Sequence, residues 1–125
     1  NKDGHLDIVT ANIGEPNRIY FGDPSMKLTN SVEFDTGKSN SYAVAIGDLD
    51  LDGFDDIVVG NAGEPNTVFL NSKEGKTWTE IQLSKNAFDT YDIMMVDLNG
   101  DGRLDIIESN SDELNSYYFN LKKAK

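Results

Sequence analysis

The sequence of 125 residues has no cysteine, a single histidine (His5) and no long apolar run. Without thiols the chain forms no disulfide, no thiolate zinc site and no cysteine nucleophile. Its longest apolar runs, such as residues 93–96, are far too short to span a bilayer, so we predict no membrane insertion. A lone histidine and the lack of a glycine-rich phosphate loop also disfavour a catalytic triad or a nucleotide site.

Basic residues are scarce. The chain has 11 Lys and Arg against 22 Asp and Glu, which gives a net charge of −11. Nucleic acids and anionic membrane surfaces both require a basic face on their protein partner, so this balance disfavours either as a partner. An aromatic content of 10% argues for a folded chain and against disorder. The excess of carboxylates therefore requires an explanation within a folded domain.

The sequence repeats with a period of 49 residues, the separation of Asp48 from Asp97. The segment at 48–66 aligns without gaps with 97–115 and with 1–17. The first copy lacks the counterpart of Asp48, so the chain opens inside a motif and we expect a longer parent protein. The repeats are 1–47, a partial unit, then 48–96, and then 97–125, another partial unit.

Each complete repeat predicts four short strands, at 42–49, 56–61, 67–70 and 77–83. Residues 77–83 alternate in polarity with period two, as a half-exposed strand does. Four strands in a repeat of this length are typical of a β-propeller blade. The sequence thus predicts an all-β fold of antiparallel four-stranded blades, about two and a half in number. Further blades of the parent, or other copies of the chain, would complete the ring.

Acidic residues recur at fixed places in the loop between the first two strands. Counting from Asp48 or Asp97 as position 1, oxygen-bearing side chains stand at 1, 3, 5 and 9, and glycine stands at 6. Alternate side chains on a tight loop converge, and position 7 would add a backbone carbonyl. Hard oxygen donors favour Ca²⁺ over zinc. The predicted metal ligands are Asn1, Asp3, His5 and Asp7; Asp48, Asp50, Asp52, Phe54 and Asp56; and Asp97, Asn99, Asp101, Arg103 and Asp105.

Two other interpretations of these loops remain open. One is a solvated acidic turn, since Asp, Asn and Gly are common turn formers. The other is an EF-hand, a helix–loop–helix calcium site, because Glu108 stands at position 12 of the third loop. The first two loops have Thr10 and Val59 there, and the flanking residues predict strands, so the sequence favours the propeller loop.

A family resemblance follows from two segments. The run from Ser41 to Gly60, with Asp-Leu-Asp-Leu-Asp-Gly at its centre, resembles the FG-GAP repeat of integrin α-subunit propellers and its bacterial VCBS-type relatives. Residues 97–107 resemble the bacterial form closely. The resemblance implies a propeller of seven or a similar number of blades, with Ca²⁺ in the loops joining first and second strands. The sequence departs from the name-giving motif, with Ser41-Tyr42 in place of Phe-Gly and residues 60–62 in place of Gly-Ala-Pro.

The loops at the other ends of these strands form a candidate ligand face. Aromatic, amide and carboxylate groups on a concave surface can bind sugars or peptides, so a glycan or a protein is the expected partner. Ordinary turn chemistry is the alternative explanation of the same residues. The candidates are Tyr42, Tyr91, Asn61, Glu64 and Asn66.

The sequence predicts a calcium-binding, non-catalytic scaffold or recognition module, as in adhesion or carbohydrate binding. Every well-placed carboxylate already belongs to a loop, which leaves none for catalysis. The alternative is a propeller segment of an extracellular enzyme, such as a polysaccharide lyase or dehydratase. Because millimolar Ca²⁺ outside cells fills sites of modest affinity, we expect an extracellular or periplasmic location.

Overall fold

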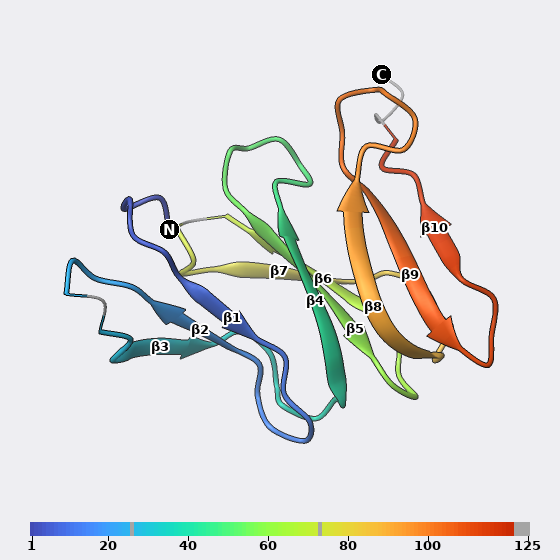
Figure 1. Cartoon of the computed structure of the whole chain (residues 1–125), viewed down its shortest axis with the longest axis horizontal. Helices are drawn as coiled ribbons and strands as arrows, with labels where there is room; N and C mark the ends of the chain where they lie inside the picture. The colour runs from blue at the N-terminus through green and yellow to red at the C-terminus, as the bar shows by residue number, and fades with distance from the viewer. Residues whose placement is uncertain (26, 73, 122–125) are drawn as a thin grey trace.

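The computed structural model describes residues 1–25, 27–72 and 74–121 (Figure 1). Ten strands form three antiparallel sheets that stand side by side. Sheet 1 comprises β1 (Ile8–Thr10), β2 (Arg18–Phe21) and β3 (Asn30–Glu33). Sheet 2 comprises β4 (Ser41–Gly47), β5 (Asp56–Asn61), β6 (Thr67–Asn71) and β7 (Trp78–Gln82). Sheet 3 comprises β8 (Asp89–Val96), β9 (Asp105–Ser111) and β10 (Ser116–Tyr118).

The sheet order confirms the predicted all-β fold of partial propeller blades. Sheet 2 is a complete four-stranded meander, sheet 1 has the counterparts of its last three strands, and sheet 3 has those of its first three. The described residues contain no helix, so the EF-hand interpretation is wrong. None of these residues forms a helix that could cross a membrane. Glu108, the EF-hand candidate, is buried in β9 and accepts hydrogen bonds from Asn66 and Tyr118.

Strand β5 is buried along its whole length because both faces of its sheet are covered. Successive side chains of a strand point to opposite faces. Ile57 and Val59 accordingly pack with Ile19 of sheet 1, whereas Val58 packs with Ile93 of sheet 3. A strand covered on both faces has a continuous apolar run in place of alternation, as residues 57–59 do.

Glycines allow sheets 2 and 3 to approach closely. A Cβ atom on Gly60 would lie 3.1 Å from both Ile93 and Thr90, and one on Gly47 would lie 2.6 Å from Cδ1 of Leu104. A larger side chain at either position would push the neighbouring sheet away. The glycines therefore bring β4 and β5 into contact with sheet 3.

A buried polar network joins consecutive sheets at the end opposite the acidic loops. Asn66, in the turn after β5, donates from Nδ2 to Thr90 Oγ1 (2.8 Å) and to Glu108 Oε1 (2.7 Å) of sheet 3. Thr90 in turn donates to Asn110 Oδ1 (2.6 Å). Between sheets 1 and 2 the same geometry recurs one period earlier, with Asn17, Ser41 and Asn61. The network fixes the orientation of each sheet relative to the next one.

The acidic loops lie together at one end of the sheets, and the turns between second and third strands lie at the other end (Figure 1). The backbone of the acidic loops is alike in all three copies. Position 6 has positive φ at Gly4, Gly53 and Gly102, and position 4 has positive φ at Lys2, Leu51 and Gly100. Glycine tolerates this conformation, whereas a side chain there costs about 1–2 kcal/mol. Lys2 and Leu51 are therefore strained positions.

The polar network predicts a large loss on truncating Asn66. Asn66→Ala leaves Thr90 and Glu108 without their buried donor, so we expect a loss of about 2 kcal/mol in unfolding free energy by urea titration. Asn115→Ala is the matched control, because the equivalent asparagine of the third repeat is exposed and should lose only about 0.5 kcal/mol. Equal losses in the two variants would contradict the role given to the network.

The loop backbone predicts that removing a side chain increases stability. Leu51 is 54% exposed, so Leu51→Gly loses little packing while relieving the positive-φ strain. We expect a gain of about 0.5 kcal/mol after the entropy of the added glycine is subtracted. Gly53→Ala should have the opposite effect. Thermal melting in the presence of a chelator separates this backbone effect from metal binding, and a lower melting temperature for Leu51→Gly would refute the explanation.

Candidate metal-binding loops

The loop between β4 and β5 is built from aspartates that bond to backbone N–H groups a few residues ahead. Asp50 Oδ1 accepts from the N–H of Asp52 (3.1 Å), and Asp52 Oδ1 accepts from that of Phe54 (2.8 Å). Asp48 Oδ2 accepts from Gly53 (2.9 Å), which closes the loop. Such turns are favoured by short side chains that carry an oxygen near the backbone. They fix the orientation of these carboxylates relative to the loop backbone.

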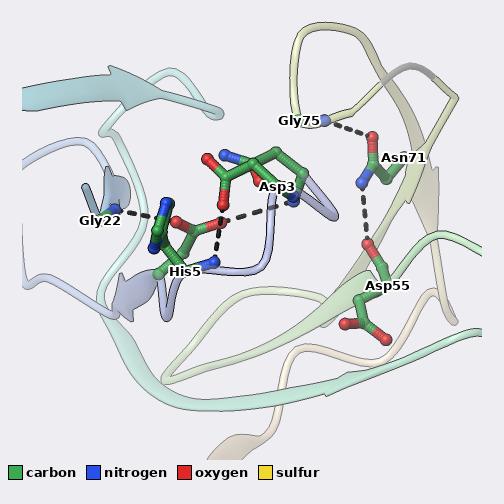
Figure 2. Close-up of polar contacts among 8 residues, drawn as sticks. Asp3, His5, Gly22, Asp55, Asn71 and Gly75 are labelled. Carbon is green, nitrogen blue, oxygen red and sulfur yellow. Dashed lines mark hydrogen bonds and ion pairs between the residues drawn. The ribbon is translucent and has the colours of Figure 1, made fainter. Parts of the chain in front are cut away.

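The other two loops repeat this geometry. In each, the residue at position 3 accepts from the N–H of position 5, and position 5 accepts from the N–H of position 7. The acceptor–donor distances are 2.9 and 3.0 Å for Asn99, Asp101 and Arg103, and 2.9 and 2.8 Å for Asn1, Asp3 and His5, where Figure 2 shows the His5 contact. The repeated sequence pattern thus corresponds to a repeated three-dimensional loop.

Three carboxylates converge in the second loop. One oxygen each of Asp48, Asp50 and Asp56 lies within 4.8 Å of the other two. Asp48 Oδ1 is buried and has no hydrogen-bond partner among the described residues. Like charges at this separation repel, and a buried acceptor without a partner costs free energy. The donor set, all hard oxygen, therefore fits a cation such as Ca²⁺. Asp52 lies outside this group, and its Oδ1 bonds to the loop backbone.

Asp56, at position 9, is 0% exposed and links three parts of sheet 2. Its Oδ2 accepts from the N–H of Leu49 in the loop, and its Oδ1 accepts from that of Asn71 at the end of β6, both at 2.8 Å. Burial raises the pKa of its carboxyl, and the charge of Asp50 acts in the same direction; the two amide bonds oppose them. A positive charge nearby would stabilise the ionised form.

This pair of bonds to the carboxylate at position 9, a carboxylate clamp, recurs in the third repeat, and its strand-side bond recurs in the first. Asp105 accepts from Leu98 (2.9 Å) and from Asn120 (2.8 Å), and Asp7 accepts from Gly22 (2.9 Å). The clamp at position 9 therefore joins the loop to the third strand of its blade, beyond the ligand role predicted for it.

Sequence reasoning missed the residues at the other side of the clamp, Asn71 and Asn120. The side chain of Asn71 accepts from Gly75 N (2.9 Å) and donates to the carbonyl of Asp55 (3.1 Å), as Figure 2 shows. Asn120 donates to the carbonyl of Leu49 in the acidic loop between β4 and β5 (2.6 Å). These two asparagines stand one period apart, and that spacing was the available signal.

The third and first loops differ from the second in detail. Asp97 Oδ2 accepts from Gly102 (2.8 Å) and Oδ1 accepts from Gly100 (2.7 Å), and these amides hold the pKa of its carboxyl below the usual range. In the first loop the terminal amine lies 3.4 Å from Asp7 Oδ2. The carbonyl ligands predicted at position 7 (His5, Phe54 and Arg103) stay predictions; the Phe54 ring lies 5.0 Å from the Lys2 ammonium.

The predicted ligand face divides into two groups. Tyr42 and Tyr91 are 44% and 51% exposed and form an edge-to-face pair with ring centroids 5.1 Å apart, each at a register shift of its strand. Asn61 and Asn66 are buried and hydrogen-bonded within the chain. Glu64 accepts from Ser39 Oγ (2.7 Å). Turn and network bonds thus engage the amides, and ligand binding at the tyrosines stays a prediction.

Comparison with known proteins agrees with this arrangement of repeated loops and sheets. The sequence model described as an FG-GAP-like repeat matches residues 1–59 and again residues 48–108. Each match begins within one acidic loop and extends past the next one. A search of curated proteins and a search of solved structures each found no match. Together the two family matches cover most of the chain, which therefore belongs to the FG-GAP-like repeat family.

Proposed function

We propose that this chain is a calcium-binding scaffold module in which the ion stabilises the blade. The observation that carries the proposal is the convergence of Asp48, Asp50 and Asp56 within 4.8 Å, with an oxygen of Asp48 buried and unpartnered. A solvated acidic turn would leave that oxygen in water. Repetition of the same turns in the third loop supports a second site of the same kind.

In the second loop Asp48, Asp50 and Asp56 would hold the ion. In the third loop the corresponding residues are Asp97, Asn99 and Asp105. Bound Ca²⁺ supplies positive charge that offsets the repulsion among these carboxylates. The chain's own contribution is the preformed loop, whose backbone N–H groups already orient Asp48 and Asp50. Through its two hydrogen bonds, Asp56 at position 9 would link the ion site to the start of the loop and to the end of the third strand.

The proposed role is structural. The second loop connects β4 to β5, and Asp56 links that connection to β6, so an ion in the loop holds three strands of sheet 2 in register. Calcium that binds only the folded state stabilises it by mass action. We place the module outside the cytosol, where millimolar free Ca²⁺ suits loops with several neutral or exposed ligands.

The proposal predicts a calcium-dependent melting temperature. At free Ca²⁺ one hundred times the dissociation constant, each filled site adds about 2.7 kcal/mol to the unfolding free energy. Differential scanning fluorimetry in Ca²⁺ and in a chelator measures the difference, which Asp48→Asn should reduce. Mg²⁺ at the same concentration should produce a smaller shift, because it dehydrates reluctantly and demands octahedral geometry.

Glu113→Gln is the matched control, since it removes one exposed carboxylate outside the loops and should leave the calcium-induced shift unchanged. An identical melting curve in Ca²⁺ and in chelator would refute the calcium site. A shift that Glu113→Gln reduces as much as Asp48→Asn does would instead indicate nonspecific charge screening.

A further inference from the structure

The asparagines that join consecutive sheets bond to carboxylates from two different places in the repeat. Asn17 Nδ2 donates to Asp35, which follows β3 in the same sheet. Asn66 Nδ2 donates to Glu108 Oε1, which lies in β9 of the following sheet (2.7 Å). Asn17 and Asn66 stand one period apart, whereas Asp35 and Glu108 do not. The interface of sheets 1 and 2 therefore takes this carboxylate from the earlier sheet, and that of sheets 2 and 3 takes it from the later one.

The sequence shows that the two interfaces have exchanged the position of the acid. One period after Asp35 stands Ser84, and one period before Glu108 stands Val59. Asp35 and Ser84 occupy the same kind of turn, because the side-chain oxygen of each accepts from the N–H two residues ahead, at 2.9 and 3.0 Å. The backbone around the first position is thus kept in both repeats, while its charge is present in only one of them.

A hydroxyl accompanies the acid in β9. Tyr118 donates from its hydroxyl to Glu108 Oε2 (3.1 Å). One period earlier stands Phe69, which has no hydroxyl and packs with Val59 in an apolar cluster. Glu108 is only 2% exposed, and a buried carboxylate requires hydrogen-bond donors. Tyr118 therefore supplies a second donor at the interface where the acid lies between the sheets.

The two acid positions are neighbours in space. Asp35 and Val59 line the same cavity of about 40 Å³ at the boundary of sheets 1 and 2. Between sheets 2 and 3, burial raises the pKa of the Tyr118 hydroxyl, while Ser84 opposes the shift and Glu108 adds to it, so both side chains reach this hydroxyl. Carboxylates at both positions of one interface would repel. With a carboxylate at neither, the asparagine would lose its charged acceptor.

We propose that these carboxylates determine which sheets can pack together, because an interface accommodates a single carboxylate at its asparagine. Sheet 1 presents Asn17 with Asp35 and fits the apolar Val59. Sheet 2 presents Asn66 with a serine and fits Glu108. Sheet 3 packed against sheet 1 would bring two carboxylates together, and a second copy of sheet 2 packed against Asn66 would bring none. The match penalises packing in the wrong order, within the chain or between copies of it, and it is independent of calcium because none of these residues belongs to an acidic loop.

Substitutions recreate one wrong interface within the full chain. Glu108→Val with Tyr118→Phe gives sheet 3 the side chains of sheet 2, so the interface has no carboxylate. Ser84→Asp should raise the unfolding constant of the unmodified chain about tenfold, and should lower that of this double variant about tenfold. Urea titration measures both effects. Ser84→Asn is the matched control, because it adds the same bulk without charge and should act alike in the two chains.

The first interface provides the reciprocal test, which applies even where the first double variant does not fold. Val59→Glu with Phe69→Tyr gives sheet 2 the side chains of sheet 3, so two carboxylates meet and the chain should lose stability. Asp35→Asn should lower the unfolding constant of this variant about tenfold, although it should raise that of the unmodified chain.

If neither Ser84→Asp nor Asp35→Asn restores stability to its double variant, the proposal is overturned. A reversal of sign that Ser84→Asn shows as well would also overturn it, since the charge would then not distinguish one sheet from another.

Discussion

The structure depends on a carboxylate at the start of the second strand of each repeat, which is fully buried in the second and third repeats. In sheet 2 this is Asp56, which has no exposed surface and accepts hydrogen bonds from two backbone N–H groups. Burying a charge is costly unless it is paired, and N–H dipoles compensate only part of that cost. The carboxylate therefore fixes the loop before it and the third strand beside it, and it favours a cation among the neighbouring aspartates. Loop geometry, strand register and the proposed ion site all follow from this one group.

The same arrangement of loop, carboxylate and strands recurs in each repeat along the chain. Sheet 2 buries alternate residues of β5 against sheet 1 on one face and sheet 3 on the other, so its core is completed by the neighbouring repeats. Polar side chains add direction to this packing: Asn17 and Asn66 each reach forward to a hydroxyl of the following sheet. Apolar contacts between sheet faces supply most of the burial, and the asparagines link consecutive sheets at the end opposite the acidic loops.

The sequence predicted the elements whose signals are local. Strand β5 was predicted at its observed bounds, because a glycine turn precedes a short apolar run. The prediction for strand β4 began one residue late and ended two residues late, since Asp48 and Leu49 belong to the loop, where the Leu49 N–H is bonded to Asp56. The clamp of Asn71 was missed because an asparagine after a strand looks like a turn former, and its partner is remote in sequence. Strain at Leu51 was equally hidden, because only the third copy has glycine there.

Native mass spectrometry during a Ca²⁺ titration would detect the calcium ion that we propose among the converging aspartates. We expect saturable binding of one ion for each of the loops at 48–56 and 97–105, with Asp50→Asn weakening only the first. The charge-state distribution of the folded chain should stay the same when Ca²⁺ binds. If the chain kept its metal-free mass at millimolar Ca²⁺, the chain would have no calcium site. If Asp50→Asn bound the same number of ions with the same affinity, the ion would not lie among these aspartates.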